Sequence, residues 1–358
     1  MQALTGLAPL AVERLRADLT ALVGPLADRR LGVAVSGGPD SMALLALAAA
    51  AFPGQVIAAT VDHGLRAESA NEAAMVTRWC EDAGVPHATL AIADRPGARD
   101  NLHDWARRRR YRLLGDWAVA GGASLLATAH HADDQAETFL MRAARGSGVA
   151  GLAGIRANDR IKVTRPVPGA MLVFDEWIVH LVRPLLGWRR RELRALAERA
   201  SLPFVDDPSN ADPRFDRARF RALLAQTPLL DSAQLARAAA HAAEADATLR
   251  AIEQWVWATR RVPATGTDHP DDEVWLDIAE LPRELRRRLA RGAIEQVRLI
   301  RGITRPTFSA ATNIESLLDA LEAGKAATQA GVIVRPAGTL WRFAEAPPRR
   351  LSGSAQSG

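Results

Sequence analysis

The sequence contains a single cysteine, Cys80, among its 358 residues. One thiol excludes a disulfide framework and any structural zinc site built from several cysteines. No stretch of 18 consecutive apolar residues is present, which excludes a membrane-spanning helix. The opening residues carry acidic side chains at helical spacing, a poor match to a secretory signal. We therefore expect a cytoplasmic protein without a membrane segment.

Lysine is almost absent too. Of the 46 basic residues only Lys162 and Lys325 are lysines, so 46 minus 2 leaves 44 arginines, and the net charge is +5. Guanidinium groups match phosphates and stack on bases, so the composition suits a polyanionic partner such as a nucleic acid. A solvated arginine-rich surface would give the same composition. The charge alone does not decide between these two interpretations.

Apolar runs of strand length alternate with helical segments in the first part of the chain. The predicted strands cover residues 31–35, 56–64, 86–93 and 124–131, and the predicted helices cover 8–27, 42–51, 69–83, 102–121 and 133–144. Strands that alternate with helices of this length predict an α/β fold with a doubly wound, mostly parallel sheet.

The rest of the chain predicts smaller parts. Residues 160–184 hold two apolar runs around a Pro/Gly turn, which predicts a β-hairpin inserted in a first domain of residues 1–214. Residues 215–300 are rich in Ala, Arg and Leu and predict a helical domain. Residues 301–347 predict a small C-terminal module with a hairpin around Gly338, and residues 348–358 a disordered tail.

The segment SGGPDS, residues 36–41, lies between the first predicted strand and a helix. Its two glycines let the backbone turn tightly and approach a ligand, and the helix start offers free N–H groups to an anion. Ligands of open α/β sheets bind beyond the carboxyl ends of strands, which is where this segment falls. The alternative is an ordinary strand–turn–helix corner with a capping serine. The lysine of a Walker A loop is absent.

The SGGxDS pattern resembles the PP-loop ATP pyrophosphatase superfamily, whose members adenylate a substrate and release pyrophosphate. The resemblance implies that this loop cradles the phosphates of ATP and that Asp40 contacts Mg²⁺, an ion that prefers carboxylate and phosphate oxygens. Asp62, at the end of the second strand, reaches the same sheet edge. The expected nucleotide-binding residues are Ser36, Gly37, Gly38, Pro39, Asp40, Ser41 and Asp62.

Two further blocks carry charged pairs at helical spacing. Arg107 and Arg110 share one face of the helix in residues 101–114. Asp134 and Glu137 share a face at the start of the helix after HHADDQAET, where the helix dipole favours their ionised forms and where they could hold an ammonium group. A solvated arginine face and a dipole-compensating cap are the respective alternatives. The neighbouring His130 and His131 point opposite ways on a strand and find no third zinc ligand.

The blocks VDHGLR, ATAHHADDQAETFLMR, RGSGVAGLAG and RPLL…FVDDPSNADPRFDRARFR, in this order, resemble the tRNA(Ile)-lysidine synthetases over about residues 28–225. That family uses ATP to adenylate carbon 2 of the wobble cytidine in tRNA(Ile) with a CAU anticodon. L-lysine then displaces AMP to give lysidine, so that codon reading changes from AUG to AUA. The chain is thus expected to be a ligase that forms a carbon–nitrogen bond.

The resemblance also implies residue roles. Asp134 and Glu137 would recognise lysine, Arg107 or Arg110 would contact ATP or the adenylated base, and His131 would steer proton transfer. The family layout further implies a homodimer.

The segment PRFDRARFR mixes cations with Phe215 and Phe220, which suits RNA backbone contact and base stacking. The expected tRNA contacts are Arg214, Arg217, Arg219 and Arg221, and residues 215–300 would form a tRNA-docking domain. The alternative is a charged helix that its two phenylalanines anchor to the core.

Two other functions are open at this point. A PP-loop tRNA thiolation enzyme generally needs catalytic cysteines or an iron–sulfur cluster, whereas Cys80 stands alone in a predicted helix. A non-catalytic RNA- or nucleotide-binding protein would be built on a degenerate PP-loop, and the intact SGGPDS and DDQAET segments argue against it.

Overall fold

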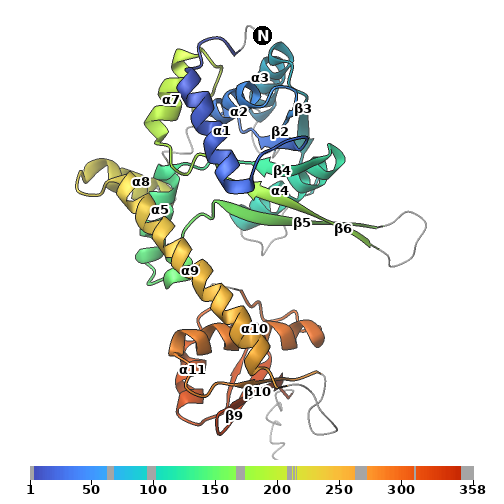
Figure 1. Cartoon of the computed structure of the whole chain (residues 1–358), viewed down its shortest axis with the longest axis vertical. Helices are drawn as coiled ribbons and strands as arrows, with labels where there is room; N and C mark the ends of the chain where they lie inside the picture. Colours follow the sequence, from blue (N-terminus) through green and yellow to red (C-terminus); the bar gives the residue numbers. More distant parts are fainter. Residues whose placement is uncertain are drawn as a thin grey trace, which may run out of the picture. The chain divides into compact units, whose positions relative to one another are not determined.

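The computed structural model describes residues 4–62, 68–94, 102–166, 174–207, 212, 214, 216–262, 272–309 and 312–347. They belong to two compact units, Met1–Glu244 and Ala245–Gly358. Figure 1 traces the elements of each unit along the chain. Among the described residues, no helix is long and apolar enough to cross a membrane.

The first unit is built on a six-stranded sheet of order β3-β2-β1-β4-β6-β5. Its strands are β1 (Arg30–Ala34), β2 (Val56–Asp62), β3 (His87–Ala91), β4 (Ala123–Ala127), β5 (Asn158–Pro166) and β6 (Phe174–Val182). All neighbours pair in parallel except β5, which is antiparallel to β6. The predicted doubly wound, mostly parallel α/β sheet is confirmed.

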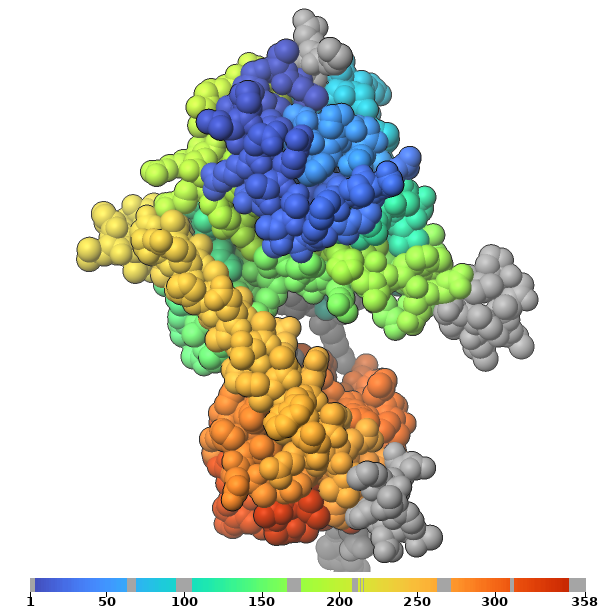
Figure 2. All heavy atoms as spheres, in the orientation of Figure 1, coloured from blue at the N-terminus to red at the C-terminus, as the bar shows by residue number. Residues whose placement is uncertain are grey.

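Helices cover both faces of this sheet (Figure 1). On one face lie α1 (Pro9–Val23), α2 (Pro39–Ala51), α3 (Glu68–Ala83) and α7 (Arg190–Arg199), and on the other lies α4 (Leu102–Ala120). The unit also contains α5 (Ala132–Ala143), α6 (Val149–Leu152), α8 (Asp216–Gln226) and the start of α9 (Ser232–Arg260). Figure 2 shows α1, in dark blue, on the visible face of the unit.

Side chains alternate between the two faces because successive strand residues point to opposite sides. Leu31 and Val33 of β1 join the core that includes α1, α2 and α7, whereas Ile57 of β2 joins the core formed with α4. Gly32 allows a close approach on the second face, since an added Cβ would lie 3.0 Å from the Trp117 ring. These two cores fix the strand ends relative to one another.

The predicted hairpin at residues 160–184 is confirmed as β5 and β6, but it is part of the main sheet. Strand β6 pairs in parallel with β4, so the hairpin extends the sheet at one edge. Val179 and Leu181 are buried in the same core as Leu114 of α4, which explains why these strands stay with the sheet.

The second unit packs α10 (Arg283–Ile300) and α11 (Glu315–Glu322) against an antiparallel sheet of order β7-β10-β9-β8. The strands are β7 (Val274–Asp277), β8 (Ala327–Gln329), β9 (Val332–Ala337) and β10 (Leu340–Glu345). The hairpin predicted around Gly338 is confirmed as β9 and β10.

Two expectations for this region differ from the structure. Strand β7 interrupts residues 215–300, which the sequence pattern predicts as wholly helical, because Val274 and Leu276 pair with β10 and enter the core. Helix α10 shares that core with the C-terminal strands. The units therefore divide after Glu244 and not at residues 214 and 300. The predicted tail, residues 348–358, lies outside the described residues.

Candidate active site

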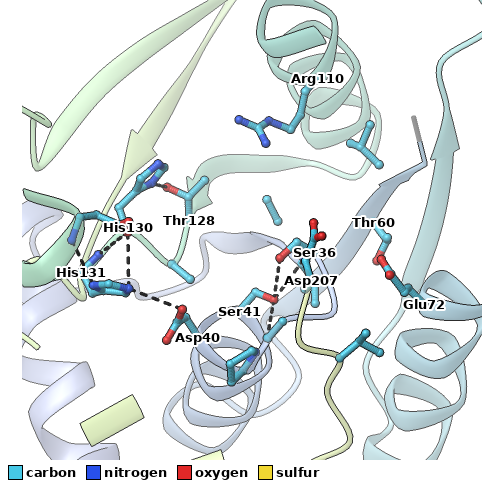
Figure 3. A pocket seen from close by; sticks show the side chains of 18 of the residues that line it. Ser36, Asp40, Ser41, Thr60, Glu72, Arg110, Thr128, His130, His131 and Asp207 are labelled. Atoms are coloured by element: carbon cyan, nitrogen blue, oxygen red, sulfur yellow. Dashed lines mark hydrogen bonds and ion pairs between the residues drawn. The ribbon is translucent and has the colours of Figure 1, made fainter. Parts of the chain in front are cut away.

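A cavity of about 620 Å³ opens in the first unit where β1, β2 and β4 end (Figure 3). It brings together the loop of residues 36–41, the start of α5, and arginines from α4 and α8. The expected site residues that line it are Ser36, Gly38, Pro39, Asp40, Ser41, Arg107, Arg110, His131, Asp134, Arg217 and Arg221. Segments almost 200 residues apart in the chain thus meet at one sheet edge.

The loop of residues 36–41 has the geometry of an anion cradle. Gly37 adopts φ +83°, a backbone conformation that favours glycine. The Ser41 hydroxyl donates to Gly38 O at 2.9 Å and accepts from the Ser36 N–H at 3.1 Å, which holds the turn closed. Helix α2 then starts without a side-chain cap, so its first-turn N–H groups remain available to an anion.

Asp40 has the one orphaned carboxylate oxygen among the described residues of this loop. Its Oδ1 atom is buried and makes no hydrogen bond, while Oδ2 lies 3.5 Å from His131 Nε2. No cluster of three or more His, Cys, Asp or Glu side chains in the described parts of the chain could hold a metal unaided. Mg²⁺ is commonly bound by one or two carboxylates together with substrate phosphates, and Asp40 Oδ1 fits that arrangement.

His131 caps helix α5 and faces the loop at the same time. The ring atom Nδ1 of His131 accepts from the backbone N–H of Asp134 at 3.3 Å. The backbone N–H of His131 donates to Asp134 Oδ2 at 3.2 Å. His131 Nε2 points toward Asp40 and lies 3.5 Å from Asp40 Oδ2 (Figure 3). Asp133 accepts from the Arg190 N–H at 2.7 Å and so ties the start of α7 to the start of α5.

The pKa values of the two adjacent histidines are shifted in opposite directions. Burial opposes protonation of His131, yet the hydrogen bond to Asp40 and the charge of Asp134 outweigh it and raise the pKa of His131. Burial lowers the pKa of His130 to about 3, and its Nδ1 lies 2.9 Å from Thr128 Oγ1. His130 is therefore neutral at neutral pH, whereas the neighbouring carboxylates shift the pKa of His131 upward.

Asp134 and Glu137 do not face the same surroundings. Asp134 lines the cavity, whereas the Glu137 side chain is 2% exposed and is absent from the lining. Glu137 Oε1 accepts from Arg221 Nε at 2.6 Å, and Oε2 lies 3.3 Å from Arg217 Nε. Burial raises the pKa of Glu137, and Arg221 opposes the rise. Asp134 thus faces the cavity and Glu137 does not, although both carboxylates were expected to hold one ammonium group.

Gly37 and three other expected residues are also absent from the cavity lining. Asp62 accepts from the Ser69 hydroxyl at 2.7 Å, at the start of α3. Arg214 pairs with Asp212 at 2.6 Å, and Arg219 pairs with Asp216 at 2.7 Å. Phe215 lies outside the described residues. Because no residue of α8 is buried, Phe220 does not anchor this helix in the core.

Sequence reasoning missed several polar groups of the cavity, among them Thr128 and Arg190. Thr128 follows β4 and holds His130, and Arg190 begins α7. Arg190 belongs to a run of three arginines that is indistinguishable from a solvated surface in the sequence. Its hydrogen bond to Asp133, 57 residues away, is visible only in the fold.

Cys80 is buried in α3, and burial raises its pKa to about 12. A thiol with such a pKa is protonated at neutral pH and is a poor nucleophile. The chain's one cysteine is thus unsuited to sulfur transfer.

Known proteins are similar to this chain over most of its length. The PP-loop domain family matches residues 12–227. The tRNA(Ile)-lysidine synthase of Zymomonas mobilis is 41% identical over 330 residues, 92% of each chain, and that of Novosphingobium aromaticivorans is 44% identical over 340 residues, 95% of each chain. The structure of the U34-tRNA thiolase NcsA from Methanococcus maripaludis matches with a TM-score of 0.49 at 17% identity, over 64% of this chain and 78% of that one.

Proposed function

This chain belongs to the tRNA(Ile)-lysidine synthase family and carries its PP-loop domain, and we propose that it ligates L-lysine to a tRNA base at the expense of ATP. The acceptor is carbon 2 of the wobble cytidine in tRNA(Ile) with a CAU anticodon. In the first step the base oxygen on carbon 2 attacks the α-phosphorus of ATP, and pyrophosphate leaves. In the second step an amine of lysine attacks carbon 2, and AMP leaves with that oxygen.

The proposal rests on one structural observation. A single cavity joins an anion-binding loop to a carboxylate at the start of another helix, with His131 between them. His131 Nε2 lies 3.5 Å from Asp40 Oδ2 and 3.6 Å from Asp134 Oδ2. One end of the cavity suits phosphates, and the other suits a cationic amine.

The residues at the phosphate end have distinct roles. The loop of residues 36–41 and the start of α2 would bind the ATP phosphates through backbone N–H groups. Asp40 would hold Mg²⁺ through Oδ1, and the ion, when bound, neutralises charge on the leaving pyrophosphate. Arg107 and Arg110 of α4 would contact the α-phosphate or the adenylated base.

Asp134 is the carboxylate placed to position lysine. A free lysine amine has a pKa of about 10.4, so the attacking amine must lose a proton, and a carboxylate beside it would oppose that loss. Asp134 therefore suits the other, non-reacting amine. His131 Nε2 lies between the carboxylates of Asp40 and Asp134, so its role would be to keep these two side chains in place.

The tRNA partner suits the open side of this site. A base in a single-stranded anticodon loop can leave its stack cheaply and enter a pocket. Arg214 and Arg219 are exposed beside the cavity-lining Arg217, and they suit contacts with the RNA backbone. The homodimer, the cytoplasmic location and a docking role for residues 215–300 stay predictions.

Labelled lysine tests the function. We expect ATP- and Mg²⁺-dependent incorporation into a tRNA(Ile) transcript with a CAU anticodon, and none into the same transcript with a UAU anticodon. Absence of incorporation at saturating ATP, lysine and tRNA would refute the proposal. Thiolation of the tRNA in a sulfur-transfer assay would instead support the competing reaction.

A further inference from the structure

Three polar side chains form a hydrogen-bonded network from helix α3 to the cavity wall. His87 of β3 lies between two threonines: its Nε2 is 3.0 Å from Thr60 Oγ1, and its Nδ1 is 3.1 Å from Thr77 Oγ1. Thr60 of β2 is 5% exposed and lines the cavity (Figure 3). Thr77 belongs to α3, which covers this face of the sheet.

The proton of the Thr77 hydroxyl sets the direction of these hydrogen bonds. Thr77 Oγ1 donates to Ala73 O at 2.9 Å, a bond that threonine commonly makes within a helix. A hydroxyl has a single proton, so Thr77 Oγ1 is an acceptor toward His87, and His87 Nδ1 is the donor. Burial lowers the pKa of His87, so at neutral pH the ring is neutral and carries one N–H. His87 Nε2 is then an acceptor.

Thr60 ends the network on the cavity side. Because His87 Nε2 is an acceptor, the Thr60 hydroxyl donates its proton to the ring and has only lone pairs left for another partner. Thr60 Oγ1 has no second hydrogen bond within the described part of the chain. A hydroxyl held in this way accepts from the N–H or O–H group of a ligand and does not donate to a carbonyl oxygen.

The nucleoside of ATP suits such an acceptor. The phosphate loop follows β1, and Thr60 lies on β2, the strand next to β1 in the sheet. Val61, Tyr111 and Leu114 line the same cavity and offer apolar surface to a base. Adenosine carries hydrogen-bond donors at its 6-amino group and at its ribose hydroxyls.

We propose that Thr60 accepts a hydrogen bond from the nucleoside of ATP, and that His87 and Thr77 are positioning residues that keep Thr60 an acceptor. This inference rests on the proposed function, because it assigns ATP to this cavity. The network would disfavour a nucleotide that presents a carbonyl oxygen at the same point, since two facing acceptors leave each other unpaired.

Calorimetry of ATP binding to the whole chain, without tRNA or lysine, tests the contact. We expect Thr60→Val to bind ATP about fivefold more weakly, the effect of losing one hydrogen bond, and Thr60→Ser to stay within about twofold of the wild type. Thr89→Val is the matched control, because Thr89 is exposed on β3 and does not line the cavity. Wild-type affinity in Thr60→Val overturns the proposal.

Three analogues of ATP identify the donor. Purine riboside triphosphate lacks the 6-amino group, and 2′-deoxy-ATP and 3′-deoxy-ATP each lack one ribose hydroxyl. For one of them the wild type and Thr60→Val should bind equally well, because the donor is already absent. A fivefold difference that persists with all three overturns the contact, since Thr60 would then act only on the shape of the site.

Nitrogen-15 NMR of the ligand-free chain tests the direction of the network. The His87 ring, identified by the signals missing from His87→Gln, should carry its proton on Nδ1. Thr77→Val should let the ring populate both tautomers and weaken ATP binding about twofold. A proton on Nε2 in the wild type, or an unchanged tautomer and ATP affinity in Thr77→Val, overturns the positioning roles.

The proposed function fails separately from this inference. A wild-type chain that shows these differences in ATP binding but incorporates no lysine refutes the ligase reaction alone. Lysine incorporation together with full ATP affinity in Thr60→Val refutes the inference alone, and a wild-type chain that binds no ATP refutes both.

Discussion

His131 Nε2 lies 3.5 Å from Asp40 Oδ2, a contact that joins the start of α5 to the start of α2 (Figure 3). The two helices follow different strands of the sheet, β4 and β1, which are neighbours in it. A histidine at a helix N-terminus, where the dipole disfavours a cation, needs compensation. Asp40 and Asp134 supply it, and the pair links the expected magnesium carboxylate to the expected lysine carboxylate.

Replacement of His131 by asparagine should change stability in a pH-dependent way. Asn keeps an N-cap acceptor for the Asp134 N–H but removes the charge. The folded-state pKa of His131 is raised, so its stabilisation is complete below its unfolded value, about 6.5, and is lost as pH rises through the folded value. Urea unfolding of the wild type and His131→Asn from pH 5.5 to 9 should show their largest difference at low pH. A difference that grows with pH would contradict this assignment.

Replacement of Asp40 by asparagine should abolish the ATP-dependent half-reaction. Asn retains the size of the side chain but is a much weaker magnesium ligand, and the buried Oδ1 has no other partner to keep it in place. We expect tRNA-dependent ATP–pyrophosphate exchange to fall about 100-fold or more, with partial recovery at high Mg²⁺. Asp175→Asn, on the exposed hairpin, is the matched control. Normal exchange in Asp40→Asn would remove Asp40 from the magnesium site.

Two glycine substitutions separate backbone strain from ligand binding. Gly37 (φ +83°) and Gly54 (φ +74°) both lie in the left-handed region, so alanine at either position should cost about 1–2 kcal/mol of unfolding free energy. Gly54 is in a turn with no atom within 4 Å of an added Cβ. Only Gly37→Ala should also weaken ATP binding in calorimetry, because Gly37 shapes the phosphate loop. Equal ATP affinity in both variants would contradict the loop assignment.

The meeting of the phosphate loop with the start of α5 could be predicted from the sequence. Both segments follow buried parallel strands, and the carboxyl ends of parallel strands share one sheet edge. The turn at Gly37 also depends on local chemistry, since two glycines and a helix start lie within six residues. The sequence pattern was sufficient to predict a feature such as this turn, because the residues that determine it are close together in the chain.

The separation of Asp134 from Glu137 could not be predicted in this way. Spacing of three residues puts both on one side of α5, which is correct. Their different partners come from elsewhere: Arg221 is 84 residues beyond Glu137 and occupies it before any ligand does. The tertiary structure therefore determines which of these two carboxylates is accessible from the cavity.

The structure adds a third explanation for the many arginines, besides a nucleic-acid partner and a solvated surface: ion pairs within the second unit. In α10, Arg283 pairs with Glu315 and Asp319, and Arg288 pairs with the fully buried Asp246. Each of these guanidinium groups binds several acceptors through its planar set of five N–H donors, a geometry that the three donors of a lysine ammonium do not provide. Part of the positive charge in residues 215–300 thus stabilises the second unit and is already paired.

Replacement of His130 by glutamine should make the protein less sensitive to acid. Burial lowers the folded-state pKa of His130 to about 3, whereas the unfolded chain takes up the proton near pH 6.5. Between these values the unfolded state binds more protons, so the wild type loses stability as pH falls from 6.5 toward 3. Gln retains a polar group within reach of Thr128 but does not titrate. Unfolding in urea at pH 7, 5.5 and 4.5 should show the advantage of the wild type shrinking at each step. A constant difference would mean that the pKa of His130 is the same in the folded and the unfolded chain, an outcome that burial of the ring beside Thr128 argues against.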